Sequence, residues 1–239
     1  MKKKEDTTAR PLIRTFSVHY REKYGKPVGK IPLDVGVICP NREKGGCIFC
    51  RPEGFTPGYL TPADNFEKQL EKGRQGLLKN RFQLYFAYFQ QETCTAAPTD
   101  MLLEIIEHLL KKPYCLGVII STRPDHIQEE FLNPLAPLIN RSGKECLFEL
   151  GLQSMHDRSL ARLNRNHSVD DFLKAHRMIT AYQQFQIGAH LLFGIPEETT
   201  GDMLATVRAV AELGVDALKL HHLQVLQDTH LSTMFMRGE

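Results

Sequence analysis

The sequence has 239 residues, of which 42% are hydrophobic and 24% are charged; these ordinary proportions exclude a collagen-like or disordered chain. No apolar run approaches the ~20 residues of a membrane-spanning helix, and no apolar segment follows the basic start, so the N-terminus is not a secretory signal. We therefore expect a cytoplasmic protein with no membrane association.

The charge is nearly balanced but unevenly distributed. Thirty Lys and Arg against 28 Asp and Glu give +2 overall. Residues 1–30 hold nine basic and three acidic residues, or +6, which leaves −4 for residues 31–239. We therefore expect a basic N-terminal extension over residues 1–30. Such a segment either contacts an anionic partner such as RNA or is a solvated tail.

Short apolar runs alternate with amphipathic segments along the chain. Six runs with little polar alternation predict strands at residues 33–38, 82–89, 115–121, 146–151, 185–194 and 217–226. The segments between them predict helices at residues 62–79, 99–111, 125–139, 169–182 and 199–213. Thr61 is the expected N-cap of the first helix, and Pro134 and Pro137 should interrupt the third.

A repeated strand–helix order implies an α/β fold with a parallel sheet and right-handed crossovers. A doubly wound open sheet and a barrel-like curl both fit, and six strands are fewer than the eight of a closed (β/α) barrel. In either arrangement, functional side chains are expected at the carboxyl ends of the strands.

Three of the six cysteines crowd into one loop with the spacing C-x7-C-x2-C: Cys39, Cys47 and Cys50. Gly45 and Gly46 allow this loop to fold back so that the thiolates converge. Three thiolates without a nearby fourth ligand suit a [4Fe–4S] cluster that leaves one iron open to a small molecule. A zinc site remains an alternative on ligand count.

The other three cysteines are scattered. Cys115 and Cys146 begin apolar strands and are expected to be core thiols. Cys94 lies in the loop after the second predicted strand and is either a radical relay or, as we favour, an idle thiol.

Several motifs after the cysteine loop resemble those of the radical S-adenosylmethionine (radical SAM) superfamily. Phe49 precedes the last cysteine, and the later segments are YFQ at 88–90, STRPD at 121–125, ELGLQS at 149–154, LNRNH at 163–167, HLLFGIPEET at 190–199 and LH at 220–221. They are similar to the branch of the elongator catalytic subunit and oxygen-independent coproporphyrinogen oxidase, and most similar to the YhcC-type radical SAM family.

This resemblance implies a partial (β/α)6 TIM-like barrel whose radical SAM core spans residues 31–239. Relatives continue past the sixth strand, so the chain is expected to be C-terminally truncated. The implied cofactors are a [4Fe–4S] cluster on Cys39, Cys47 and Cys50 and S-adenosylmethionine (SAM), which chelates the fourth iron. An external electron donor, flavodoxin- or ferredoxin-like, would drive SAM cleavage to a 5′-deoxyadenosyl radical that abstracts hydrogen from substrate.

The resemblance also assigns SAM contacts to individual residues. Phe49, Leu192 and Ile195 would flank the adenine, and Gln153 would read the ribose hydroxyls. Arg165 would pair with the methionine carboxylate through its bidentate fork.

The remaining expected contacts match the superfamily less closely. Gln90 and Gln91 replace its glycine-rich turn, and Ser121 stands where the branch often has glutamate. His190 takes the place of a polar residue on the fifth strand. Glu149 lies in an apolar strand, where a carboxylate needs a partner.

Other interpretations stay open at this point. Arg165 and His167 could simply complement a helix end. The whole chain could be a zinc-stabilised nucleic-acid-binding module. It could also be a non-catalytic βα scaffold with a degenerate site, for which Gln90, Gln91 and Ser121 argue. The substrate is unidentified. The resemblance is compatible with RNA or a tetrapyrrole, and the basic extension favours RNA.

Overall fold

The computed structural model describes residues 13–61, 64–77, 79 and 81–238. Its centre is one sheet of six parallel strands in the order β1-β2-β3-β4-β5-β6. The strands are β1 (Val28–Leu33), β2 (Leu84–Phe89), β3 (Cys115–Thr122), β4 (Glu145–Gln153), β5 (Phe185–Phe193) and β6 (Ala217–His222).

Strand order decides between the two arrangements that the sequence allows. A doubly wound sheet reverses its order at a switch point, whereas these strands follow the chain without reversal. The ends of the sheet also approach one another, because Lys219 Nζ of β6 lies 2.6 Å from the hydroxyl of Tyr88 on β2. The sheet is therefore curled, and the expected partial (β/α)6 barrel is confirmed.

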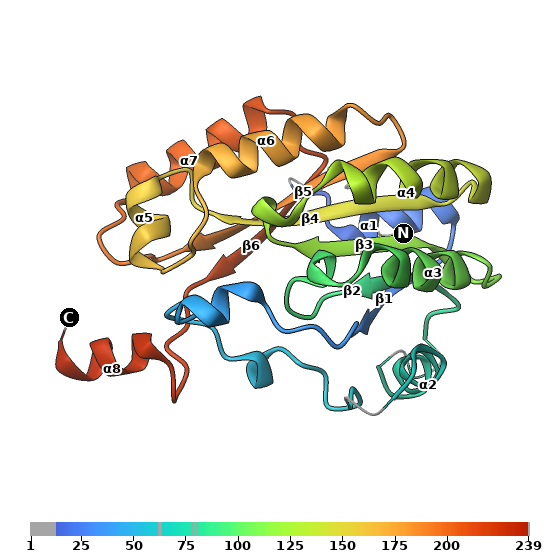
Figure 1. Cartoon of the computed structure of the whole chain (residues 1–239), viewed down its shortest axis with the longest axis horizontal. Helices are drawn as coiled ribbons and strands as arrows, with labels where there is room; N and C mark the ends of the chain where they lie inside the picture. The colour runs from blue at the N-terminus through green and yellow to red at the C-terminus, as the bar shows by residue number, and fades with distance from the viewer. Residues whose placement is uncertain (1–12, 62–63, 78, 80, 239) are drawn as a thin grey trace, which may run out of the picture.

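Eight α-helices accompany the strands in the described part of the chain. They are α1 (Phe16–Tyr24), α2 (Phe66–Lys72), α3 (Thr99–Leu110), α4 (Glu129–Ser142), α5 (Asp157–Arg162), α6 (Val169–Thr180), α7 (Thr200–Glu212) and α8 (His230–Arg237). Helices α3, α4 and α6 cover the convex side of the sheet, and α1 lies on the opposite side (Figure 1). In the described ranges, none of these helices is long and apolar enough to cross a bilayer.

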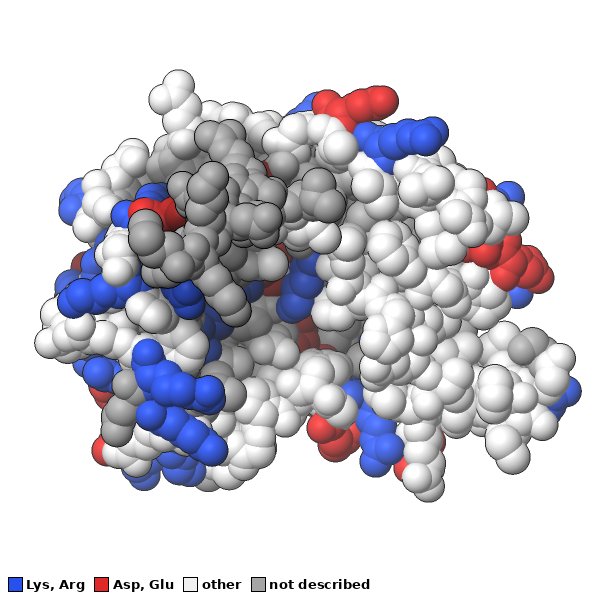
Figure 2. Space-filling model, turned by 180° about the vertical axis from the view of Figure 1, so that it is seen from behind, with Lys and Arg blue, Asp and Glu red and all other residues white. Residues whose placement is uncertain are grey.

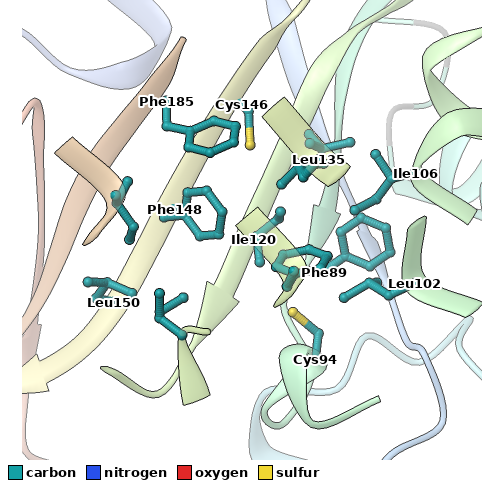
Figure 3. Close-up of a cluster of buried hydrophobic side chains, with 14 of the residues drawn as sticks. Phe89, Cys94, Leu102, Ile106, Ile120, Leu135, Cys146, Phe148, Leu150 and Phe185 are labelled. Atoms are coloured by element: carbon teal, nitrogen blue, oxygen red, sulfur yellow. The ribbon is translucent and has the colours of Figure 1, made fainter. Parts of the chain in front are cut away.

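The main core lies between the convex side of the sheet and its helices. Figure 3 shows Phe148 and Phe185 of neighbouring strands beside Leu135 of α4 and the Cys146 side chain. Cys94 is also part of this apolar cluster, with 1% of its surface exposed, and burial raises the pKa of its thiol to about 12. Cys94, Cys115 and Cys146 are therefore core thiols.

The first strand lies earlier than predicted. Val28–Leu33 pairs with Leu84–Phe89 at the edge of the sheet, where Pro32 is tolerated because its missing N–H faces no partner strand. The apolar run at residues 33–38 is mostly loop, turned at Gly36 (φ 77°), whose N–H donates to Asp34 Oδ1. Lys30 and Pro32 interrupt the apolar run of β1, so the hydrophobic pattern of the sequence does not reveal this strand.

The boundary expected at residue 30, between an N-terminal extension and the core, is also wrong for residues 13–30. Helix α1 packs Tyr20 against Phe86 on the concave side of the sheet, and β1 begins at Val28. This part of the expected basic extension therefore belongs to the barrel. Residues 1–12 lie outside the described residues.

Two predicted helices differ from the structure. Helix α4 continues through Pro134 and Pro137, because its opposite face, including Phe131 and Leu135, is buried on the sheet. Helix α2 begins at Phe66 with Asn65 as its N-cap, while Thr61 bonds to Asp64 instead. The proposed first helical residue, Pro62, lies outside the described residues.

The β3–β4 register can be tested at Gly117, which pairs with Glu145. A Cβ atom at Gly117 would lie 2.0 Å from the Glu145 carbonyl oxygen. Gly117→Ala must therefore displace one strand, and we expect the free energy of unfolding, measured in urea, to fall by about 1–3 kcal/mol.

The matched control is Gly58→Ala, because a Cβ atom at Gly58 meets nothing within 4 Å. Its free energy of unfolding should stay within about 0.5 kcal/mol of wild type. Equal losses in the two variants would show that the strands do not pair in this register.

Candidate functional site

The cysteine loop begins after β1 and turns back on itself at the carboxyl edge of the sheet. A short 3-10 helix, Pro40–Lys44, follows Cys39, and Gly45 and Gly46 then take φ values of 90° and 72°. The Gly46 N–H donates to the Asn41 carbonyl at 2.8 Å. These two left-handed glycines bring Cys47 and Cys50 back towards the start of the loop.

Side chains from several elements point at the three thiols. Thr93 Oγ1, fully buried after β2, lies 3.2 Å from Cys39 Sγ. Asn41 Nδ2 and Arg165 Nη1 approach Cys47 Sγ at 3.2 and 3.3 Å, and an Arg42 nitrogen lies 3.9 Å from Cys50 Sγ. All these groups can donate, so each sulfur has a donor suited to a thiolate.

The thiols also influence one another. Burial, followed by the neighbouring Cys47, raises the pKa of Cys50 to about 11, with a smaller contribution from Cys39. Within the ranges the structure describes, no three Cys, His, Asp or Glu side chains are arranged to enclose a single metal ion. A cluster that binds each cysteine through a separate iron is chemically suited to this donor set, because metal ligation keeps crowded thiols deprotonated.

Asparagines fasten the cysteine loop to the connection between α5 and α6. Asn41 Nδ2 donates to the Asn164 carbonyl at 2.8 Å, and Asn166 Nδ2 donates to Asn41 Oδ1 at the same distance. Asn164 Nδ2 donates in turn to the Gly46 carbonyl at 2.6 Å. Asn164 and Asn166 both have positive φ, 51° and 52°, which asparagine tolerates better than most residues.

An ion pair holds the other side of the loop. Glu92 accepts two bonds from the Arg42 guanidinium, the shorter at 2.7 Å, and a third from the Cys39 N–H at 3.1 Å. Glu92 lies two residues beyond Gln90 and has a φ of 52°. The loop after β2 therefore positions the first cysteine directly.

An apolar wall lies beside the thiols. Ile48, between two of the cysteines, packs with Leu192 and Ile195 from the end of β5. Leu163 and Leu231 complete the cluster, and the Leu231 N–H donates to the Ile48 carbonyl at 2.9 Å. Phe49 is partly buried against this wall, so Phe49, Leu192 and Ile195 belong to one apolar cluster.

The end of β4 is bent to make room for polar side chains. Gln153 has a φ of 77°, and the pairing with β5 is irregular between Leu150 and Gln153. A Cβ atom at Gly151 would lie 3.0 Å from Arg165 and 3.3 Å from Gln153. Glycine at position 151 therefore lets both side chains approach the same point.

Arg165 is buried beneath this point, with 8% of its surface exposed. Its guanidinium donates to the Gly151 carbonyl at 2.7 Å and to His167 at 3.2 Å, besides its contact with Cys47. Burial and the adjacent arginine lower the pKa of His167 to about 4, so this imidazole is neutral and can accept. Arg165 is thus more than a helix-end cation.

Gln90, Gln91 and Ser121 lie at the ends of β2 and β3. Gln90 is partly exposed, and its side chain reaches the Phe55 carbonyl at 3.4 Å. Gln91 is buried and accepts from Thr56 at 3.0 Å, while its Nε2 has no hydrogen-bond partner among the described residues. Ser121 pairs with Glu149 in the sheet register.

Glu149 lies at the centre of a charged network on the concave face. One carboxylate oxygen accepts from Lys30 at 2.9 Å, and the other accepts from Tyr88 at 2.7 Å and His190 at 2.8 Å. Lys219 lies 3.6 Å away and donates to the Tyr88 hydroxyl. We call these five residues the concave ring.

The ionisation states of the concave ring follow from its burial and charges. Although burial opposes ionisation, His190, Lys30 and Lys219 together hold the pKa of Glu149 well below its usual range. Burial outweighs the Glu149 contact and lowers the pKa of His190 to about 4. At neutral pH the ring therefore contains the Glu149 carboxylate and the neutral His190 imidazole.

Comparison with known proteins identifies the family. The model of the radical SAM superfamily matches residues 33–210 of this chain. The chain belongs to the radical SAM superfamily. Its cofactors are accordingly a [4Fe–4S] cluster and SAM, and this decides against the zinc-stabilised module that the cysteine count left open.

Curated relatives are similar over nearly the whole chain. Protein YhcC of Escherichia coli is 32% identical over 95% of this chain and 73% of its own length. YtqA of Bacillus subtilis is 32% identical over 94% of this chain and 70% of its own length. The resemblance to YhcC-type radical SAM proteins is therefore confirmed.

Solved radical SAM structures share the fold. Methylornithine synthase (PylB) superposes with a TM-score of 0.60 at 13% identity, over 88% of this chain and 58% of its own. Coproporphyrinogen III oxidase (HemN) of Escherichia coli gives 0.53 at 15% identity, over 84% of this chain and 45% of its own. The chain thus spans about half of these radical SAM structures.

Several residues of this candidate site were given no role by the sequence analysis. The concave ring includes Lys30 and Lys219, whose charge inside short apolar strands was the available signal. The residues around the thiols are Asn41, Arg42, Thr93, Asn164 and Asn166. Asn41 and Arg42 lie within the cysteine loop, and Asn164 and Asn166 lie within the LNRNH segment. Their roles could not be assigned from the sequence, because they act through contacts with distant segments.

The His190 side chain, which is only 12% exposed, predicts a pH dependence. Its folded-state pKa, about 4, lies below the ordinary value of 6.5, so the unfolded chain binds a proton first as the pH falls. The stability that neutral His190 contributes is present above pH 6.5 and is lost between pH 6.5 and 4. Between pH 6.5 and 4, the free energy of unfolding of His190→Gln should therefore fall less than that of wild type, by on the order of 2 kcal/mol. The measurement is urea unfolding across this range.

An exposed histidine provides the control. His230→Gln at the start of α8 should keep the wild-type decline in unfolding free energy, because the side chain lies at the surface. The assignment of a neutral buried His190 would be wrong if His190→Gln declined as steeply as wild type.

Proposed function

We propose that this chain is the core of a radical SAM enzyme that modifies RNA, with its cluster held by Cys39, Cys47 and Cys50. The convergence of Thr93, Asn41, Arg42 and Arg165 on the three thiols supports this assignment above all. When bound, the cluster and SAM supply a 5′-deoxyadenosyl radical that abstracts hydrogen from substrate.

The chain's own residues orient the cofactors and exclude water. Donors to the cysteine sulfurs favour thiolate ligation and tune the cluster's reduction potential. The apolar wall around Ile48 and Leu192 shields one side of the loop from solvent. Phe49 and Ile195 extend this wall and offer an apolar surface for the adenine.

Polar SAM contacts are proposed at the bent end of β4. Gln153 would bind the ribose hydroxyls. Arg165 would bind the methionine carboxylate. Three of its five guanidinium N–H groups donate to Gly151, His167 and Cys47, and the other two would contact the carboxylate. Gln90, Gln91 and Ser121 at the neighbouring strand ends would complete the amino-group and ribose contacts.

An RNA substrate is supported by charge and by one relative. Residues 1–12, which precede the barrel, hold four basic and two acidic residues. The tRNA uridine(34) acetyltransferase of Methanocaldococcus infernus is 29% identical over 54% of this chain and 23% of its own. Radical SAM enzymes generally need an external reductant, and we propose a flavodoxin- or ferredoxin-like donor. All six cysteines are free thiols, which favours the cytoplasm.

Substitution of a proposed ligand tests the cluster. Cys47→Ala should lose most of the iron of anaerobically reconstituted protein, together with reductive cleavage of SAM, because one thiolate ligand is missing. Iron content, the visible absorption of thiolate–iron charge transfer and 5′-deoxyadenosine release are the measurements.

Cys94→Ala is the matched control, since Cys94 belongs to the apolar core. It should retain about four irons per chain and wild-type SAM cleavage. A Cys47→Ala protein with full iron content and activity would refute the ligand assignment. Wild-type protein that binds iron but never SAM would instead support a degenerate scaffold.

Salt dependence tests the RNA proposal. Replacing Lys2, Lys3 and Lys4 by Ser should weaken binding of a tRNA and flatten the slope of log K against log salt, by up to about 2 for three lost phosphate contacts. Binding is measured by mobility shift at rising salt. Replacing the exposed Lys111, Lys174 and Arg177 should leave the slope unchanged, whereas equal effects of the two triple variants would argue against RNA contact by the N-terminal segment.

A further inference from the structure

We propose that the concave ring binds an oxyanion of the substrate, either a phosphate or a carboxylate. This inference rests on the proposed function, because it names the chemical group by which a substrate would be held below the cysteine loop. Lys219 is the central contact, with Lys30 and the neighbouring His221 beside it.

Hydrogen-bond accounting leaves the ring with unused donors. Both oxygens of Glu149 are occupied, one by Lys30 and the other by Tyr88 and His190. Lys219 donates one N–H to Tyr88, and each ammonium has three. Among the residues that the structure describes, Lys30 and Lys219 therefore have N–H groups to spare, and an oxyanion is the ligand that accepts several of them at once.

The charges point to the same ligand. Two ammonium groups share a single buried carboxylate, and the imidazoles of His190 and His221 have pKa values lowered by burial. Burial also lowers the pKa of Lys219, although the Glu149 carboxylate opposes this effect. A bound anion would balance the excess charge.

The excess charge faces open space on the concave side. The Lys30 and Lys219 side chains are 26% and 32% exposed, while the Glu149 side chain between them is 5% exposed. Figure 2 views the molecule from behind Figure 1 and shows a hollow in this face, with basic and acidic side chains inside it. The two ammonium groups are therefore accessible to a ligand, whereas the carboxylate is enclosed.

The concave ring also lies close to the proposed cofactor site, within two residues along β5. Leu192, two residues beyond His190 on β5, packs against Ile48 of the cysteine loop. Two strand residues span ~7 Å. A substrate whose anionic group bound Lys219 would thus present the atoms next to that group to the carboxyl edge of the sheet.

Binding of two aryl probes to the reconstituted, SAM-saturated protein tests the inference. Phenyl phosphate and phenylacetate have the same apolar body and differ in the oxyanion. We expect saturable binding of at least one, measured by isothermal titration calorimetry. Lys219→Met should weaken this binding about tenfold or more, because it removes a charged donor and keeps the stem.

Lys219→Arg should restore binding to within about threefold of wild type, which a merely structural loss in Lys219→Met would not predict. Lys174→Met, which removes an exposed lysine from α6, should bind the probes like wild type. If Lys219→Met binds both probes as tightly as wild type, or wild type binds neither, the inference is wrong.

The two probes separate the sources of the anion. Tighter binding of phenyl phosphate assigns the ring to a phosphate, as in a nucleotide, and tighter binding of phenylacetate assigns it to a carboxylate. SAM cleavage by the wild-type protein is measured in parallel without probe. Cleavage without probe binding overturns this inference alone, whereas probe binding without cleavage overturns the proposed function.

Discussion

One buried carboxylate ties the barrel together. Glu149 on β4 receives hydrogen bonds from Lys30 on β1, Tyr88 on β2 and His190 on β5, and Lys219 of β6 approaches the same oxygen. Five of the six strands thus converge on a single group. Because a lone buried charge is costly, these contacts can be satisfied only if the sheet curls, and the curl in turn creates the concave face on which the proposed substrate site lies.

The cysteine loop depends on a second, purely polar set of contacts. Asn41, Asn164 and Asn166 form a bracket that joins the loop to a connection more than a hundred residues later in the chain. Glu92 and Arg42 hold the opposite side. The positive φ values of Glu92, Gln153, Asn164 and Asn166 gather at the same edge of the sheet, so backbone strain is concentrated where we propose that the cofactors bind.

Local patterns in the sequence predicted much of this architecture. Five strands and most helices lie within a few residues of their predicted positions, because buried parallel strands and amphipathic helices have clear periodicity. The cysteine spacing pointed to the loop in which the thiols of Cys39, Cys47 and Cys50 influence one another. The strand Val28–Leu33 was missed because Lys30 and Pro32 break the apolar run, and Pro134 and Pro137 were overruled by the packing of α4. The concave ring could not be predicted, since each of its contacts joins different strands and appears only once the curl is known.

The order of the strands leaves the barrel without a closing strand ladder. In the described part of the chain β1 and β6 each pair with one neighbour and not with each other. The segments that follow these two strands meet instead, because Arg51 donates to the Gln227 carbonyl and the Leu231 N–H donates to the Ile48 carbonyl. The side of the barrel between its first and last strands is therefore held by loops, and one of them is the cysteine loop itself.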